Sequence, residues 1–264
     1  MSIHGPDGRL AALPQAPVGA DAGRGAPGEQ APRYLWIREQ LVRMIIDGGL
    51  KGGAALPSEG QLARHFGVAL GTLRKAIDEL VARNVVERVQ GKGLFVAAYD
   101  IQAAMRLFRI VDATDTKQLP KFEKLLGIRD RAATANERLR LGLRKGEKVV
   151  ELRRTRSFPD GAVMLETICL PGSRFADFRT RLGAERPVLL YDFYEQEYGV
   201  HVVSVESRLR AVAASSGDAS EMGLPEGHPV LEVERVAFEL DGAPVELRTT
   251  LCDTTASRHY LDGR

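Results

Sequence analysis

The residues best suited to contacting a nucleic acid lie between positions 33 and 97. Thr72, Arg74 and Lys75 fall early in a predicted helix, and Gln90-Gly91-Lys92-Gly93 is a basic turn between two short alternating runs. Arginine pairs bidentately with guanine, whereas lysine neutralises phosphate, so the helix suits a base edge and the turn suits the DNA backbone. Each feature also has a purely structural explanation. Thr72 can be an ordinary residue of the first helical turn, Lys75 a solvated lysine, and residues 90–93 an ordinary hairpin turn.

Three predicted helices and a hairpin position these residues. The first helix starts at Tyr34 and ends at Gly48-Gly49, and Ser58 with Gln61 makes a capping box that starts the second. A third helix over about 70–84 follows the glycine at Gly67, and residues 85–89 and 94–97 alternate as strands. This order of parts can place one helix in a DNA major groove and lay a wing along the adjacent backbone.

The charge distribution supports the same assignment. Residues 33–97 hold ten Lys/Arg against six Asp/Glu, a net charge of +4, while residues 98–264 hold 25 against 26 and the first 32 residues hold two against three. The positive charge therefore lies in the segment that would need it for attraction to phosphate.

The C-terminal half reads as an α+β domain with a mostly antiparallel sheet. Strands are predicted at 149–157, 163–170, 200–213, 230–239 and 244–252, and helices near 119–126, 189–197 and 219–223. Arg154 and Arg156 alternate on the first of these strands and so share a face, which favours an anionic ligand, with surface salt bridges as the alternative.

Residues 33–97 resemble the winged helix–turn–helix of GntR-family transcription regulators. The resemblance depends on Gly49-Leu50, Leu56-Pro57-Ser58-Glu59, Leu62-Ala63, Val68, Thr72-Leu73-Arg74, Ala76, Leu80, Gln90-Gly91-Lys92-Gly93 and Phe95-Val96. It implies a homodimer that binds double-stranded operator DNA, usually to repress transcription, with Thr72, Arg74, Lys75 and the turn 90–93 as the DNA-binding residues.

The remainder resembles the UTRA effector domain of the subfamily typified by the histidine-utilisation repressor. The matching pieces are Leu152-Arg153-Arg154-Thr155-Arg156, Leu165-Glu166-Thr167, Leu170-Pro171, Leu190-Tyr191-Asp192, Tyr198-Gly199-Val200, Met222-Gly223-Leu224-Pro225-Glu226-Gly227 and Pro244-Val245-Glu246. This resemblance implies a chorismate-lyase-like fold that binds a small-molecule effector.

The expected effector-binding residues come from the strands of this domain. They are Arg154, Arg156, Glu166, Thr167, Glu246 and Arg248, and the resemblance places both glutamates at positions that line the pocket. Tyr191 is a further candidate whose alternative role is in the core.

Two departures from the family pattern affect the DNA-binding part. Gly60 occupies the place of an arginine that contacts DNA in the family, and Ala69-Leu70 replaces the family's Ser-Arg. The expected consequence is an altered operator sequence with DNA binding retained, because Arg74, Lys75 and Lys92 remain.

The expected organisation is a disordered Gly/Ala/Pro-rich tail over 1–31, or an artefact of the start site, then a winged helix–turn–helix over 32–98, a linker over 99–104 and a UTRA-like domain over 105–261. No cofactor, metal site or catalytic residue is expected, since the two cysteines are far apart and no nucleophile motif occurs. No apolar run is long enough to span a membrane, so a cytoplasmic protein is expected.

The leading hypothesis is a repressor that a small, anionic metabolite releases from its operator. The alternative from another class is an enzyme that uses the chorismate-lyase-like fold, with the winged helix only regulatory. A third possibility is an activator, or a scaffold that binds DNA without a ligand.

Overall fold

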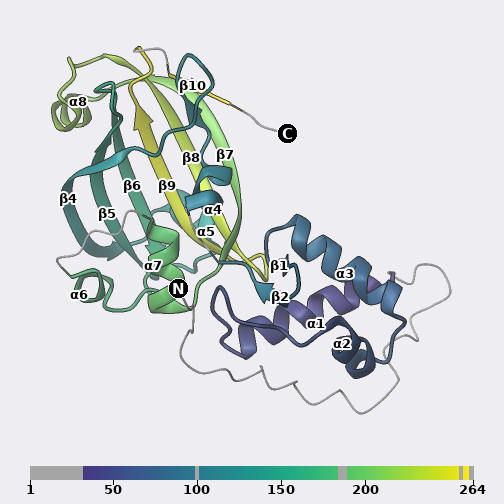
Figure 1. Ribbon diagram of the computed structural model, residues 1–264. Coiled ribbons are helices and arrows are strands. Elements are labelled where there is room, and N and C mark those ends of the chain that lie inside the picture. The colour runs from purple at the N-terminus through teal and green to yellow at the C-terminus, as the bar shows by residue number, and fades with distance from the viewer. Residues whose placement is uncertain (1–31, 99–100, 184–188, 256–257, 262–264) are drawn as a thin grey trace. The chain divides into compact units, whose positions relative to one another are not determined.

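The computed structural model describes residues 32–98, 101–183, 189–255 and 258–261 (Figure 1). The chain divides into two compact units, the first ending at Ala98 and the second beginning at Tyr99. The tail expected over 1–31 lies outside the described residues.

The first unit packs three helices, α1 (Arg33–Asp47), α2 (Glu59–Phe66) and α3 (Leu70–Ala82), around one apolar core. The capping box predicted at the start of α2 is confirmed, because the Ser58 hydroxyl accepts from the Gln61 N–H while the Gln61 side chain accepts from the Ser58 N–H. Helix α2 ends at Gly67, whose φ of 60° is a left-handed conformation that favours glycine. The most deeply buried side chains here include Ile37, Leu41, Ile45, Leu62, Leu73, Ile77 and Leu80.

A two-stranded hairpin completes this unit. Strands β1 (Val86–Val89) and β2 (Gly93–Val96) pair antiparallel with Val89 opposite Gly93. The turn between them needs positive φ at Gly91 (74°) and Gly93 (111°), which a side chain would disfavour. The segment before α2 pairs with β2, since the Leu56 N–H donates to the Leu94 carbonyl. The predicted winged helix–turn–helix is therefore present.

A six-stranded antiparallel sheet forms the centre of the second unit (Figure 1). Its order is β4-β5-β6-β9-β8-β7. The strands are β4 (Lys121–Ala132), β5 (Lys148–Ser157), β6 (Val163–Pro171), β7 (Val202–Ala213), β8 (Pro229–Glu239) and β9 (Pro244–Cys252). Short strands β3 (Ile110–Val111) and β10 (His259–Tyr260) form a separate pair. The prediction of an α+β domain with a mostly antiparallel sheet is confirmed.

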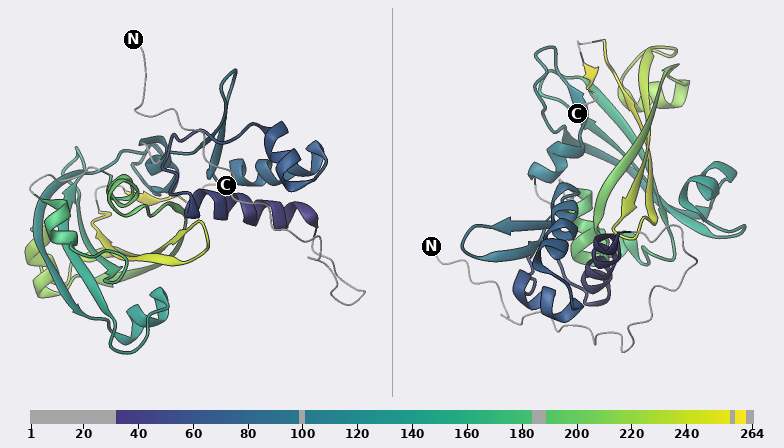
Figure 2. Two further views of the ribbon diagram at one scale, coloured as in Figure 1. Left: turned by 90° about the horizontal axis from the view of Figure 1, so that it is seen from below. Right: turned by 90° about the vertical axis from the view of Figure 1, so that its right-hand side faces the viewer.

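Helices lie on both faces of this sheet (Figure 2). We call the face to which Arg154, Glu166 and Arg248 point the pocket face. Helices α6 (Phe178–Leu182) and α7 (Leu190–Tyr198) pack on it through an aromatic cluster that includes Phe175. The opposite face, which we call the second face, carries α5 (Ala135–Leu141) at one end and α8 (Ser216–Met222) at the other.

The helix predicted over 119–126 is wrong, because that segment belongs to strand β4. Phe122, Leu125 and Ile128 stand three residues apart, a spacing typical of a helix, yet they pair with Arg156, Arg154 and Leu152, which stand two apart. Two register shifts, at Phe122/Lys124 and Leu125/Gly127, insert the extra residues. The two β-bulges therefore change the spacing of the apolar residues from two, as in a regular strand, to three, which resembles a helix.

Part of the segment expected to be a linker is helical. Helix α4 spans Ile101–Leu107, and its Ala103 and Ala104 are buried. Helix α5 was not predicted, although Thr134 and Glu137 form a second capping box with the same pattern as the one before α2.

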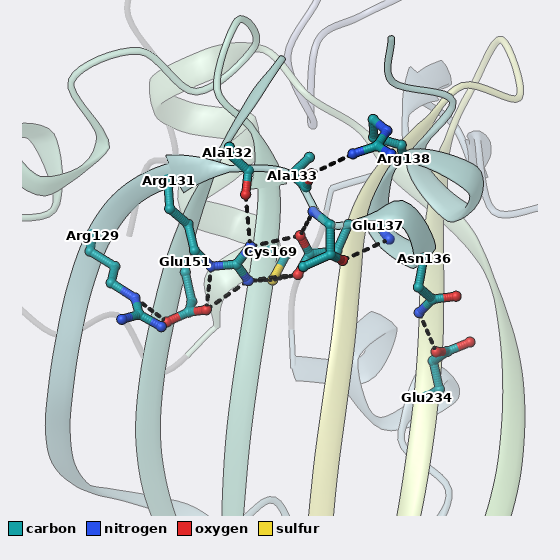
Figure 3. A network of polar contacts seen from close by, with 11 residues as sticks. Arg129, Arg131, Ala132, Ala133, Asn136, Glu137, Arg138, Glu151, Cys169 and Glu234 are labelled. Carbon is teal, nitrogen blue, oxygen red and sulfur yellow. Dashed lines mark hydrogen bonds and ion pairs between the residues drawn. The ribbon is translucent and has the colours of Figure 1, made fainter. Parts of the chain in front are cut away.

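An ion-pair network ties α5 to the second face of the sheet (Figure 3). Arg131 donates to both carboxylate oxygens of Glu137, at 2.6 and 2.7 Å, and to Glu151 at 2.7 Å. Glu151 also accepts from Arg129, and the Cys169 thiol donates to Glu137. Burial alone would raise the pKa of Glu137, but Arg131 and the α5 cap lower it to about 2.

Two kinds of feature are not found among the described residues. No helix among them is long and apolar enough to cross a membrane. No group of three or more His, Cys, Asp or Glu side chains among them is arranged to hold a metal ion.

The depressed pKa of Glu137 predicts an acid-sensitive domain. An unfolded glutamate titrates near 4.5 and the folded one near 2, so its contribution is complete above pH ~5 and disappears as the pH falls towards 2. Glu137→Gln should lower the free energy of unfolding at pH 7 by on the order of 2–3 kcal/mol, and most of this loss should be gone by pH 2.

Urea unfolding followed by circular dichroism at several pH values measures this difference. Glu221→Gln, an exposed position on α8, is the control and should match the wild type throughout. A Glu137→Gln deficit that does not change with pH would contradict the ionic origin of the stabilisation.

Candidate nucleic-acid interface and anion pocket

The exposed side of α3 carries the predicted base-reading residues. Leu73, Ala76, Ile77 and Leu80 are buried against the unit's core, and the opposite side of the helix is exposed. Arg74 and Lys75 lie on this exposed side, whereas Thr72 is half-buried at its flank. The Arg74 side chain is 58% exposed, so a base edge could reach it.

Glu59 holds Arg74 in place. The Arg74 Nε donates to Glu59 at 2.7 Å, and Arg88 of β1 donates to the other oxygen of the same carboxylate at 3.2 Å. Arg88 also bonds Asp78 of α3 at 2.6 Å, so the four side chains connect α2, α3 and the hairpin. The hydrogen bond from Arg74 is the main reason that the pKa of Glu59 lies below its usual range. Among the described residues, Glu59 engages only the Nε of Arg74, which leaves both Nη groups available for a guanine.

Lys75 is held differently. Its ammonium lies 4.2 Å from the centre of the Tyr34 ring at the start of α1, a cation–π contact. The ammonium of Lys75 therefore lies beside the start of α1. This position suits a phosphate better than a base edge.

The hairpin turn presents the other predicted residues to solvent. Gln90, Gly91, Lys92 and Gly93 are all exposed. The Lys92 N–H closes the turn by donating to the Val89 carbonyl at 2.9 Å, which fixes the backbone while its side chain extends from the tip.

In the second unit, β5 and β6 bring the predicted arginines to a shared carboxylate. Arg154 and Glu166 are directly opposite in the register, and the Arg154 Nε donates to Glu166 at 2.6 Å. Arg248 donates to the other oxygen at 3.0 Å, and an Arg156 nitrogen lies 3.8 Å away. Burial would raise the pKa of Glu166, but Arg154, Arg248 and Arg156 hold it well below its usual range.

Glu246 is a second, fully buried carboxylate beneath the pocket face. Arg248 donates to both of its oxygens, at 2.9 and 2.8 Å. The hydroxyls of Tyr191 and Tyr194 donate to it at 2.8 and 2.7 Å. These four bonds use the acceptor capacity of a carboxylate, so Glu246 has none left for a ligand. It positions Arg248 and joins α7 to the sheet.

A hollow of about 420 Å³, partly open to solvent, lies over these arginines. Its lining consists of Ala104, Leu107, Phe108, Leu119, Arg154, Arg156, Leu189, Leu190, Tyr191, Arg235 and Arg248. Four guanidinium groups and apolar side chains therefore face the space, and neither glutamate is in the lining. Among the described residues, Glu166 and Glu246 are carboxylates that bond arginines of this lining.

Glu166 and Glu246, predicted to line the pocket, instead bond its arginines, and two further residues differ from what the sequence indicated. Thr167 lies next to Glu166 on β6 and opposite Arg153, so it points to the second face, away from the pocket. Arg235 was not predicted, although it interrupts the apolar alternation of Leu231, Val233 and Ala237 on β8. It pairs directly with Arg248, and its buried Nε has no hydrogen-bond partner among the described residues.

Each unit of the chain matches a known protein family. The family model described as bacterial regulatory proteins, gntR family, matches residues 33–96, and the UTRA domain model matches residues 123–258. The regulator SmoD of Agrobacterium fabrum is 30% identical over 233 residues, covering 88% of this chain and 96% of SmoD. PhnF of Escherichia coli, a transcriptional regulator, is 32% identical over 233 residues, covering 85% and 92%.

A solved structure is similar to the second unit. The ligand-binding domain of a GntR-family transcriptional regulator from Bordetella bronchiseptica is 31% identical with a TM-score of 0.54. It covers 60% of this chain and 96% of that domain.

The two parts of the interface predict different binding defects. Arg74→Ala should reduce discrimination against operators with a changed guanine by ~1–3 kcal/mol. Lys92→Ala should weaken binding to all sequences and reduce the slope of log affinity against log salt by about one phosphate contact. DNA titrations at several salt concentrations separate the two effects. Equal loss of specific and non-specific binding in Arg74→Ala would contradict base readout.

Proposed function

This chain belongs to the GntR family of bacterial transcription regulators and carries a UTRA domain, and from that premise we propose a homodimeric repressor that a small anionic metabolite releases from its operator. Several relatives are named as transcriptional repressors, including fructoselysine-operon repressors of Shigella flexneri and Escherichia coli at 26% identity. All these relatives are named as regulators, so the chain is a regulator and the enzyme alternative is set aside.

The DNA-binding part of the proposal rests on the first unit. Arg74, held by Glu59, contacts a base, while Lys75 and the turn 90–93 contact phosphates. Holding a guanidinium in place before binding reduces the side-chain entropy lost when DNA binds. Reading a two-fold operator requires two copies of α3, and each chain supplies one.

The charge of the pocket carries the effector part of the proposal. Four arginines line one hollow, and the Arg235 Nε is buried with no hydrogen-bond partner among the described residues. Arg235 and Arg248 are directly opposite each other on β8 and β9, and like charges in such a pair repel, so an anion between them is favoured. A phosphate, a sulfate ester or a carboxylate would accept hydrogen bonds from these guanidinium groups, and the apolar lining would contact the rest of the molecule.

The same pocket supports the coupling to DNA. Ala104, Leu107 and Phe108 line it, and they belong to α4 and its end, the first helix after the hairpin along the chain. A ligand that contacts α4 can favour one arrangement of this segment. A ligand that weakens DNA binding must itself bind the DNA-bound protein less tightly.

The first prediction from this proposal concerns assembly. Analytical ultracentrifugation of the protein with an operator duplex should show two chains per duplex, because paired half-sites engage two recognition helices at once. One chain per duplex at saturating protein would contradict the dimer.

The second prediction concerns the effector. A thermal-shift screen of phosphate esters, sulfate esters and dicarboxylates should identify a ligand that raises the melting temperature. Calorimetry should then show affinity 5- to 150-fold lower in the presence of operator. Equal affinity with and without operator would exclude induction by this ligand.

Arg235→Met tests the pocket itself. It should lower ligand affinity roughly 10- to 100-fold, the loss of one charged hydrogen bond, and leave operator binding without ligand unchanged. Arg210→Met is the matched control, since Arg210 is an exposed arginine on β7 bonded to Glu232. Full ligand affinity in Arg235→Met would place the anion elsewhere.

A further inference from the structure

Leu70 is an exposed apolar side chain at the start of the helix that would enter the major groove. It is the first residue of α3 and is 39% exposed, one of few large hydrophobic side chains so exposed among the described residues. It stands four residues before Arg74, so the two side chains are neighbours on one side of the helix. An exposed leucine beside a base-reading arginine suggests an apolar contact to DNA.

Two glycines beside it are not required by the fold. Gly60, the second residue of α2, and Gly71, the second of α3, have no positive φ. A Cβ at either position would meet nothing within 4 Å. Glycine favours a helix less than alanine does, and neither position recovers this through backbone geometry or packing. Glycine here does allow another molecule to approach the backbone closely.

We propose that Leu70 reads the C5-methyl group of a thymine in each half-site, and that Gly60 and Gly71 let the DNA come close enough for that contact. The inference rests on the proposed DNA-binding function and names what the helix reads. The thymine methyl is the one apolar group among the base edges of the major groove, and it is the natural partner of an exposed leucine. The operator therefore has a thymine next to the base that Arg74 reads.

Thymine-to-uracil replacement isolates this contact, because uracil keeps every hydrogen-bonding group and lacks only the methyl. The operator is first selected from random duplexes with the full-length protein, and each thymine of one half-site is then replaced in turn. One replacement should weaken binding about fourfold, the equivalent of one buried methyl group (~0.8 kcal/mol). Leu70→Ala should bind the thymine and uracil operators equally.

Leu139→Ala is the matched control, since Leu139 is an exposed leucine (81%) on α5. It should keep the fourfold uracil effect. The inference would be overturned if uracil replacement changed the affinity at no position, or changed it equally for Leu70→Ala and the wild type. Either outcome would leave DNA binding itself intact. Failure to select any duplex would instead overturn the proposed function.

Gly71→Ala tests the close approach independently of Leu70. The variant should melt at a higher temperature, since alanine favours the helix, and should bind the selected operator at least tenfold more weakly. Wild-type affinity in this variant would overturn the role given to the glycine. A rise in melting temperature would show that the loss of affinity does not come from misfolding.

Discussion

The antiparallel register of β5, β6 and β9 determines what the second unit can bind. It places Arg154 opposite Glu166 and brings Arg248 to the same carboxylate from the next strand. A shift of one residue would turn these side chains to the second face and leave Glu246 without its tyrosine partners. Charges this deeply buried are tolerated only when paired and hydrogen-bonded, so the register and the ion network depend on each other.

The carboxylates in this network serve the arginines rather than the ligand. Arg248 has five N–H donors, and Glu246 and Glu166 use three of them, which fixes the plane of the guanidinium. A fixed cation loses little entropy when an anion arrives. The carboxylates also weaken the attraction of Arg248 for any further anion.

The sequence predicted local features well and long-range ones less well. The capping box at Ser58 and the wing turn depend on neighbouring residues, and both are found as expected. The strand β4 was misread because bulges at Phe122 and Leu125 depend on pairing with β5, which no local pattern records. Arg154, Arg156 and Arg248 could be placed by strand alternation and resemblance. Arg235 needed the register of β8 against β9.

In both units a glutamate holds an arginine in place through hydrogen bonds. The glutamate of the first unit is half-buried, whereas those of the second unit are buried. Glu59 holds Arg74 at an exposed site, where salt and water screen the pair and its net contribution is small. A base can therefore compete with Glu59 for the Arg74 guanidinium at low energetic cost. Glu166 and Glu246 are 2% and 0% exposed, so Arg248 cannot leave them without stranding buried charge. Arg248 is consequently held in place by its two carboxylates before any ligand binds.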